Sequence, residues 1–173
     1  HAVLAARDIL AGFEGVALVM FADTPLVTSH TLARLVARIA NGDDIAVLGF
    51  ETPEPTGYGR ILCDDDGAVL KIVEERDARP REKAITLVNG GIMAVRAPLV
   101  FEVLDQVNTA NDQGEIYLTD IVEIGRAQDL GISVEITTAS EVMGVNDRAD
   151  LAAAEAALQT LLRRATLAAG GTL

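Results

Sequence analysis

The sequence predicts an α/β fold in which a doubly wound sheet is covered by helices on both faces. Two short apolar runs, residues 16–21 and 45–50, read as strands buried on both faces and therefore as the centre of a parallel sheet. Helical patterns alternate with these strands, which is the order typical of doubly wound sheets. Half of the 173 residues are apolar but only 3% are aromatic, so the core must consist of Val, Leu, Ile and Ala.

The first half of the chain predicts an α–β–α unit followed by a second strand and a hairpin. Turn residues separate the segments, among them Asn41-Gly42-Asp43-Asp44 before the second strand and Asp64-Asp65-Asp66-Gly67 inside the hairpin. The expected segments are helix 1–10, strand 16–21, helix 29–40, strand 45–50, and hairpin strands 60–63 and 68–75. The hairpin gives the sheet a mixed edge. Charged residues 74–83 are expected to form an exposed segment before the next strand.

The second half continues the alternation. Pro98 is expected in the first turn of a helix, where proline is favoured, and Asn146 or Asp147 is expected to cap the last helix. The expected segments are strand 85–95, helix 99–107, loop 108–113, helix 115–129, strand 132–137 and helix 148–169.

Composition excludes several classes of partner. The formal net charge of −12 argues against nucleic acid or an anionic membrane as the main partner, and no apolar stretch is long enough to span a bilayer. The single cysteine, Cys63, cannot form an internal disulfide, which fits a reducing, cytoplasmic location; we interpret it as structural. The only histidines are His1 and His30, so the sequence offers no Ser/His/Asp arrangement.

Asp23 is the leading candidate functional residue. It follows the apolar run 16–21, and in open α/β sheets ligands bind beyond the carboxyl ends of the strands. A carboxylate there could hold Mg²⁺ against a phosphorylated substrate or act as an acid or base. The alternative is a cap for the following helix, which Thr28-Ser29-His30-Thr31 introduces.

Four further features carry candidate chemistry, each with a plain structural alternative. Gly57 and Gly59 flank Tyr58 and would let backbone N–H groups approach a ligand, although an ordinary turn has the same composition. Glu74 could accept hydrogen bonds from sugar hydroxyls or be a surface acid. Asn89 interrupts an apolar strand and needs partners, either a ligand or the backbone. Asn146 could be a helix cap, a metal ligand or both.

Read in order, these motifs resemble the uridylyltransferase domain of the bacterial bifunctional N-acetylglucosamine-1-phosphate uridylyltransferase/glucosamine-1-phosphate acetyltransferases. The similarity spans essentially the whole chain. Its motifs are Phe21-Ala22-Asp23-Thr24-Pro25-Leu26, Pro55-Thr56-Gly57-Tyr58-Gly59-Arg60-Ile61, Ile72-Val73-Glu74-Glu75-Arg76-Asp77-Ala78, Asn89-Gly90-Gly91-Ile92, Gln113-Gly114-Glu115-Ile116-Tyr117-Leu118-Thr119-Asp120 and Gly144-Val145-Asn146.

The resemblance implies a Rossmann-like nucleotide-diphospho-sugar transferase fold, with a mostly parallel sheet and an inserted β-hairpin. It implies Mg²⁺-dependent transfer of UMP from UTP to N-acetylglucosamine 1-phosphate, which yields UDP-N-acetylglucosamine and pyrophosphate in a homotrimeric protein. It further implies that Asp23 and Asn146 hold the Mg²⁺. The implied substrate-binding residues are Asp23 and Asn146 themselves, Gly59, Glu74 and Asn89, with Phe21 and Ala22 along the pocket floor.

The sequence departs from that family in three respects. The glycine-rich phosphate loop and the uracil-reading segment are not in it, nor is the acetyltransferase β-helix, and Phe21-Ala22 replaces the usual tyrosine-glycine. We therefore expect residues 1–173 to be a partial uridylyltransferase domain, with residues 148–173 as its final helix and linker, and this segment alone to turn over poorly or not at all. The alternatives are a non-catalytic sugar-nucleotide-binding or assembly remnant, and a nucleotidyltransferase with another sugar or base.

Overall fold

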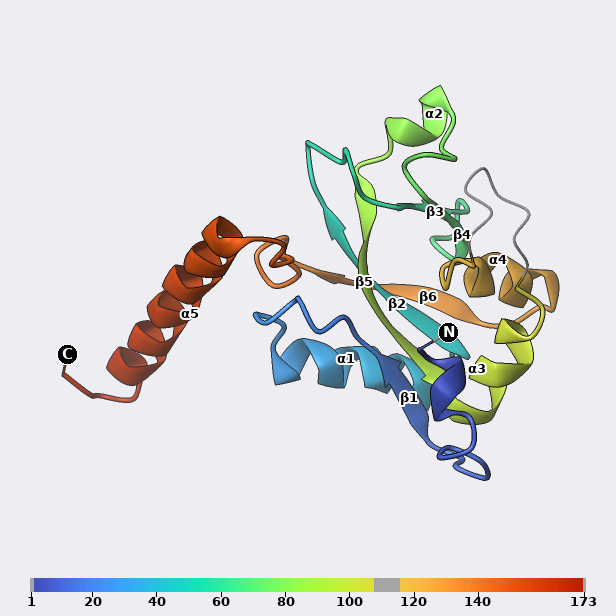
Figure 1. Cartoon of the computed structure of the whole chain (residues 1–173), viewed down its shortest axis with the longest axis horizontal. Helices are drawn as coiled ribbons and strands as arrows, with labels where there is room; N and C mark the ends of the chain where they lie inside the picture. The colour runs from blue at the N-terminus through green and yellow to red at the C-terminus, as the bar shows by residue number, and fades with distance from the viewer. Residues whose placement is uncertain (1, 108–115, 173) are drawn as a thin grey trace.

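The computed structural model describes residues 2–107 and 116–172, which form an α/β fold around a six-stranded sheet (Figure 1). The strands follow the order β4-β3-β5-β2-β6, and β1 pairs with β5. The strands are β1 (Val16–Val19), β2 (Ile45–Glu51), β3 (Arg60–Cys63), β4 (Val69–Val73), β5 (Leu87–Arg96) and β6 (Ile132–Thr137). The helices are α1 (Ser29–Ala40), α2 (Pro80–Lys83), α3 (Ala97–Leu104), α4 (Asp120–Ala127) and α5 (Arg148–Ala168), with a 3₁₀ turn, η1, at Leu4–Ala6.

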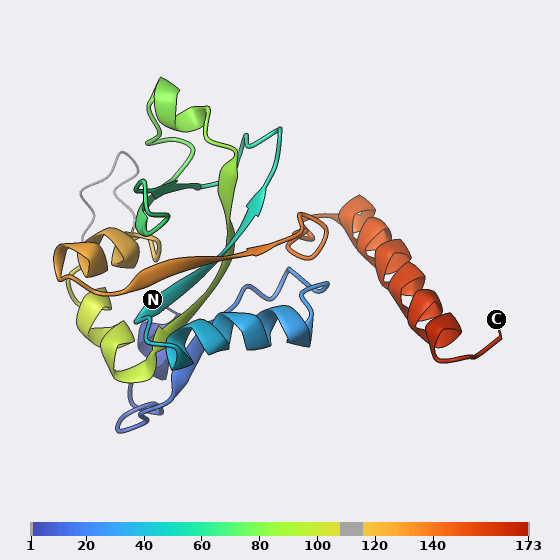
Figure 2. The same ribbon diagram turned by 180° about the vertical axis from the view of Figure 1, so that it is seen from behind.

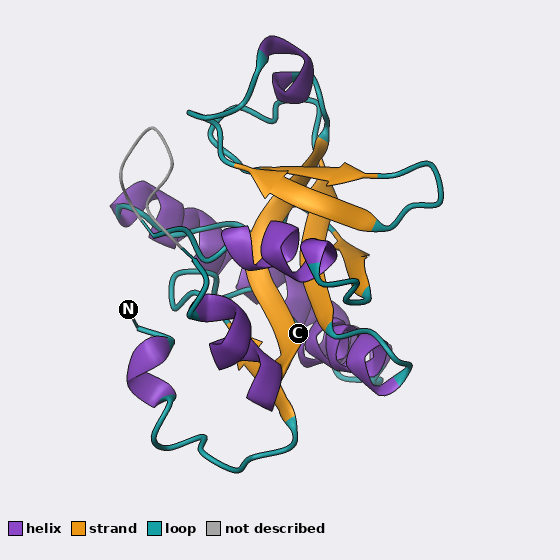
Figure 3. Ribbon diagram, turned by 90° about the vertical axis from the view of Figure 1, so that its right-hand side faces the viewer, coloured by secondary structure: helices purple, strands orange, loops and turns teal. Residues whose placement is uncertain are grey.

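The sheet is buried on both faces along β2 and β5. Alternate residues of a strand point to opposite faces, and helices cover each face. Ile45 and Val47 of β2 belong to the core cluster beneath α3 and α4, whereas Ala46 and Leu48 belong to the cluster beneath α1. Figure 3 shows the strands between these two layers of helix. The apolar run of β2 therefore has the two-sided burial that the sequence predicts.

The expectation for the first apolar run is wrong. β1 ends at Val19 rather than Phe21, and Leu18, Met20 and Phe21 are each at least 38% exposed. The physical reason is its position: within the described residues β1 pairs on one side only, with β5, so one of its edges and part of its surface stay open. An apolar run cannot by itself distinguish a central strand from an edge strand.

The sheet is also mixed rather than mostly parallel. Among the strand pairs of the described residues, only β2 with β6 is parallel. β5 runs antiparallel to β1 and to β2 and lies between them, and β3 is antiparallel to both β4 and β5. The α/β class and the inserted hairpin are confirmed, with Gly67 of the connecting turn at φ +83°. Strand direction depends on non-local pairing, which apolar patterning does not encode.

One side of β5 changes its neighbour along the strand, and this positions the functional site. At Val88 the neighbour is Arg60 of β3, whereas from Met93 onward it is β1. On its other side β5 pairs with β2, where Met93 opposes Val47 and Asn89 opposes Gly49 with a shift in register. Residues 89–92 of β5 therefore lie where β3 and β1 diverge, and a pocket opens there.

Helix boundaries follow the expectations only in part: α3 spans Ala97–Leu104 rather than 99–107, and α4 spans Asp120–Ala127 rather than 115–129. α1 and β6 have the predicted bounds, and Pro98 lies in the first turn of α3. The predicted helix over 1–10 is wrong in the described residues, which form turns and η1; so short a segment is a marginal helix on its own, and here Val3 and Leu4 pack on the core without one. The sequence also missed α2, whose N-cap backbone N–H donates to Glu82. The predicted loop 108–113 and residue 115 lie outside the described residues, whereas residues 116–119 of the helix predicted from 115 are described and form no helix.

The last helix, α5, extends away from the sheet and its covering helices (Figures 1 and 2). Asp147 caps it, since its side chain accepts from the backbone N–H groups of Ala149 and Asp150. Ala154 is its one buried residue. None of the helices in residues 2–107 and 116–172 is long and apolar enough to cross a membrane.

Candidate functional site

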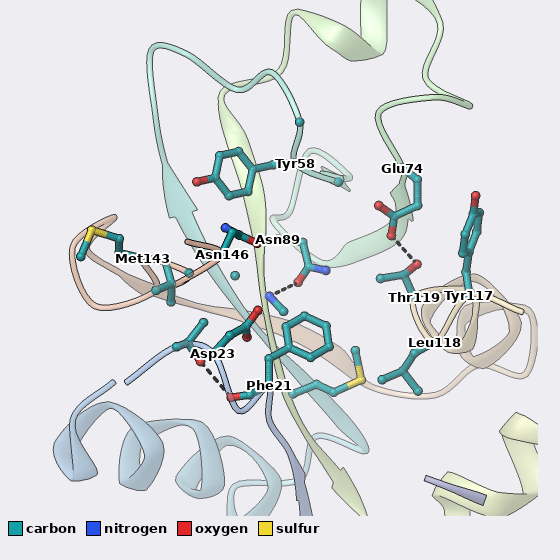
Figure 4. A pocket seen from close by; sticks show the side chains of 18 of the residues that line it. Phe21, Asp23, Tyr58, Glu74, Asn89, Tyr117, Leu118, Thr119, Met143 and Asn146 are labelled. Carbon is teal, nitrogen blue, oxygen red and sulfur yellow. Dashed lines mark hydrogen bonds between the residues drawn. The ribbon is translucent and has the colours of Figure 1, made fainter. Parts of the chain in front are cut away.

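A pocket of about 850 Å³ lies at the place where β1 and β3 diverge along β5. Six separate segments build its walls: the turn after β1, the loop before β3, the end of β4, the middle of β5, the segment that precedes α4, and the segment that leads into α5. Figure 4 shows Phe21 and Asp23 on one side and Glu74 with Thr119 on the other. At this opening between β1 and β3 a ligand can contact several strands and loops at once.

Asp23 and Asn146 reach the pocket together because their backbone segments are joined. The Val145 N–H donates to the Asp23 carbonyl at 2.8 Å, and the Asn146 N–H donates to Asp150 Oδ2 at 3.0 Å. Neither side chain is a helix cap: Thr28 caps α1 and Asp147 caps α5. Both side chains line the pocket and are exposed, so their oxygens are accessible to a ligand.

Glu74 lies on the opposite wall and accepts a hydrogen bond from the residue that precedes α4. Thr119 Oγ1, at the N-cap position of α4, donates to Glu74 Oε1 at 2.8 Å. The other oxygen, Oε2, faces Gly59, where a Cβ atom would lie 3.3 Å away. Gly59 therefore allows the Glu74 carboxylate to approach the loop backbone closely, and a larger residue would have to displace it.

Asn89 is held at the irregular step of β5. Its Oδ1 accepts from the Gly91 N–H at 3.0 Å, and its backbone N–H donates to the Gly59 carbonyl at 2.8 Å. No described residue accepts a hydrogen bond from its Nδ2 group, which is a donor that a ligand can use. The sequence left open whether the Asn89 side chain bonds to a ligand or to the backbone. The backbone bonds to its Oδ1 atom and leaves its Nδ2 group for a ligand.

Gly91 and Phe21 form the wall next to Asn89. Gly91 has φ +78°, and a Cβ atom there would lie 2.2 Å from the Phe21 ring. The ring therefore packs on the bare glycine backbone although Phe21 is 52% exposed. Both the positive φ and the close approach require glycine.

The loop before β3 is both a turn and part of the pocket wall, the two alternatives that the sequence left open. The Tyr58 N–H donates to the Pro55 carbonyl at 3.2 Å, so this segment is a turn, and Gly57 in it has φ +90°. Thr56, Gly57, Tyr58 and Gly59 also line the pocket. The Tyr58 ring packs edge-on against Phe50, with 5.1 Å between the centroids.

The described walls of the pocket are acidic. Asp23, Glu74 and Asp150 line it, and no Lys, Arg or His is among the described residues that do. Burial and the nearby carboxylates of Glu123, Glu74 and Asp77 raise the pKa of Asp120, which begins α4 behind Glu74. An anionic ligand in this pocket would therefore need a cation to offset repulsion from the walls.

Six of the seven predicted site residues line the pocket: Phe21, Asp23, Gly59, Glu74, Asn89 and Asn146. Ala22, expected along the floor, is not among the lining residues, because it lies in the exposed turn between two residues that are. Sequence reasoning missed Thr119, Met143 and Asp150 as site residues. Thr119 lay within a quoted motif, but only the packing of α4 against β4 shows that it meets Glu74. Gln113, Gly114 and Glu115 of that motif lie outside the described residues.

Comparison with known proteins identifies relatives over the whole chain. No protein-family model matches it. The "Bifunctional protein GlmU" of Maricaulis maris is 49% identical over all 173 residues, which span 38% of that relative. The proteins of the same name from Azorhizobium caulinodans and Rhodopseudomonas palustris are 49% and 46% identical over the same length and the same 38% share.

Two solved structures share the fold. A Bacillus anthracis protein assigned as a glucose-1-phosphate thymidylyltransferase, solved with sucrose, has a TM-score of 0.60 at 15% identity, over 79% of this chain and 51% of its own. A CMP:2-keto-3-deoxy-manno-octonic acid synthetase, complexed with CTP, has a TM-score of 0.62 at 16% identity, over 88% and 66%. These likenesses bear on the fold alone and confirm that it is the Rossmann-like fold of nucleotide-sugar transferases. Over its whole length the chain is 49% identical to these relatives named bifunctional protein GlmU, and it spans 38% of their length.

Proposed function

We propose that the protein carrying this chain is a nucleotidyltransferase that forms UDP-N-acetylglucosamine and pyrophosphate from UTP and N-acetylglucosamine 1-phosphate. One observation carries the proposal: six residues proposed for this site, spread over residues 21–146, line a single pocket. The relatives named bifunctional protein GlmU support a sugar nucleotidyltransferase, and the resemblance described above supplies the particular sugar and base. The chain spans 38% of these relatives, so the activity proposed is that of the whole protein.

The reaction is a displacement at phosphorus. A phosphate oxygen of the sugar 1-phosphate attacks the α-phosphorus of UTP, the bond from that phosphorus to the bridging oxygen breaks, and pyrophosphate leaves with the electron pair. The chain supplies positioning rather than a covalent intermediate. Glu74 would accept hydrogen bonds from sugar hydroxyls, while the Asn89 Nδ2 group and the backbone at Gly59 would hold the sugar against β5.

The residues present fit a magnesium ion. Asp23 and Asn146 offer carboxylate and amide oxygens, the hard donors that Mg²⁺ prefers, and a backbone hydrogen bond ties their segments together. The described residues contain no cluster of three or more His, Cys, Asp or Glu that could hold a metal by itself. This matches an ion held by one or two protein side chains together with substrate phosphates and water. When bound, Mg²⁺ would neutralise phosphate charge that the acidic walls repel.

A second candidate is a pocket that binds a sugar nucleotide without turning it over. The observation in its favour is the lack of Lys, Arg and His among the described residues that line the pocket. Phosphoryl transfer ordinarily needs cationic side chains at the phosphates besides the metal.

The test is pyrophosphate release from a panel of sugar 1-phosphates and nucleoside triphosphates with Mg²⁺, using the full-length protein. We expect release with UTP and N-acetylglucosamine 1-phosphate well above every other combination. Another preferred pair would assign a different nucleotidyltransferase. Saturable binding of UDP-N-acetylglucosamine without any pyrophosphate release would favour the second candidate.

A further inference from the structure

An ion pair between a buried arginine and a partly exposed glutamate lies directly behind the sugar-facing side of the pocket. Arg60, the first residue of β3, has a side chain that is only 2% exposed, and its Nη2 lies 2.6 Å from Glu75 Oε2. Neither residue lines the pocket, but each follows directly after one that does: Arg60 after Gly59 and Glu75 after Glu74. The pair therefore joins the backbones of the two segments that meet the sugar in the proposed function.

The same two side chains also hold the loop that precedes β3. Arg60 Nη1 donates to the Tyr58 carbonyl, and the Gly57 N–H donates to Glu75 Oε2 at 3.4 Å. Arg60 Nη2 reaches the Lys83 carbonyl at 3.4 Å, which adds the end of α2. One guanidinium thus connects the loop, the end of β4 and α2, and such a planar fork holds its partners in fixed directions.

The energetics of the pair argue against a role in stability alone. Burying the Arg60 guanidinium requires its desolvation, while the Glu75 side chain remains 27% exposed, so their attraction is offset by this cost and weakened by solvent. Arg60 Nε is also buried without a hydrogen-bond partner among the described residues, which adds a further penalty. A pair that adds little net stability but orders three segments fits a role in the geometry of the site.

We propose that Arg60 and Glu75 are positioning residues that hold residues 56–59 and Glu74 in the arrangement that receives the sugar 1-phosphate. The inference rests on the proposed function and deepens it, since neither residue touches the substrate. The loop is then held by two sets of contacts: the Tyr58 turn with the Phe50 ring, and the guanidinium of Arg60.

The experiment compares three variants of the full-length protein: Arg60→Lys, which keeps the charge but not the fork; Glu75→Gln; and the apolar double variant Arg60→Met/Glu75→Leu. Lys71→Met is the matched control, because the Lys71–Glu82 pair (3.2 Å) also connects β4 to α2 but lies outside the pocket. Melting temperature and the KM for each substrate are measured for every variant.

We expect the KM for N-acetylglucosamine 1-phosphate to rise about tenfold or more in all three variants, with much smaller changes in the KM for UTP. The double variant should keep a melting temperature close to that of the unmodified protein, and Lys71→Met should leave both KM values unchanged. A double variant with an unchanged sugar KM, or with equal losses for both substrates, would overturn the inference.

Hydrogen–deuterium exchange provides a readout that does not depend on activity. Amides of residues 52–60 should exchange faster in the Arg60 and Glu75 variants than in the unmodified protein, while those of β6 should not change. Unchanged exchange in residues 52–60 would overturn the inference whatever the kinetics show. An unmodified protein that forms no UDP-N-acetylglucosamine would instead contradict the proposed function, and deuterium uptake would then decide whether the pair holds the loop.

Discussion

The hydroxyl of Thr119 donates a 2.8 Å hydrogen bond to Glu74 Oε1 and so joins residues 45 positions apart in the sequence. Thr119 is only 7% exposed and occupies the N-cap position of α4, yet its hydroxyl caps no backbone N–H of that helix. The hydroxyl donates instead to the Glu74 carboxylate on the pocket wall. This hydrogen bond leaves Glu74 Oε2 facing Gly59 and the pocket, so α4 determines how Glu74 is presented to a ligand.

Thr119→Val should weaken sugar binding, because the hydroxyl is lost while shape and volume are kept. A hydrogen bond to a charged group contributes about 1.5–3 kcal/mol, so we expect a rise of about tenfold or more in the KM for N-acetylglucosamine 1-phosphate. Thr119→Ser retains the hydroxyl and is the control, with a KM close to that of the unmodified protein. Equal KM values for the Val and Ser variants would show that the hydroxyl does not position Glu74.

Gly91→Ala should destabilise the protein more than Gly67→Ala. Both glycines have similar positive φ, +78° and +83°, so the backbone strain of about 1–2 kcal/mol is shared. Only at Gly91 would the new Cβ atom meet the Phe21 ring, whereas nothing lies within 4 Å of it at Gly67. Chemical denaturation measures both free energies of unfolding. In a Phe21→Ala background the excess loss at Gly91 should disappear, and its persistence would contradict the contact.

Asp23→Asn should abolish most Mg²⁺-dependent turnover without affecting the fold. Asp23 is exposed, so its side chain contributes little to stability, and we expect an unchanged melting temperature. Loss of a charge-stabilising group in a phosphoryl-transfer site lowers kcat by on the order of 10²-fold or more. Magnesium titrations of the full-length protein measure the effect, with Asp65→Asn, in the exposed hairpin turn, as the control. A normal rate at saturating Mg²⁺ would remove Asp23 from the metal site.

The Glu75 carboxylate should make stability depend on pH on the acid side. The hydrogen bond from Arg60 lowers the pKa of Glu75 in the folded protein, so its contribution is present at neutral pH and is lost as the pH falls through this lowered value. Glu75→Gln should therefore lower the melting temperature near pH 7, and the difference from the unmodified protein should shrink as the pH falls through the lowered pKa of Glu75.

Melting curves from pH 3 to pH 8 test this pH dependence, with Glu54→Gln as the control, since Glu54 is exposed in the loop that follows β2. The control should match the unmodified protein at every pH. A difference for Glu75→Gln that persists unchanged at pH 3 would show that the ion pair is not its source.

Local patterns were sufficient for much of the fold. The N-cap at Thr28 and apolar spacing predict α1 at its observed bounds, and the Asp-Gly turn predicts the hairpin. The candidate site was predicted by the resemblance of several motifs to one family, because each of its residues taken alone had a plain structural alternative. Six of the seven residues so predicted line the pocket.

Only the tertiary structure decided which strands pair and which side chains meet. Residues 16–21 and 45–50 are apolar runs of equal length, yet β1 has one strand partner among the described residues and β2 has two. The Thr119–Glu74 and Arg60–Glu75 contacts likewise depend on the register of the hairpin and the packing of α4. Caps, turns and apolar periods are properties of neighbouring residues, so the sequence by itself determined them. Strand pairing and side-chain contacts join segments that are distant in the sequence. They depend on how well the whole chain buries its apolar residues, so only the folded structure determines them.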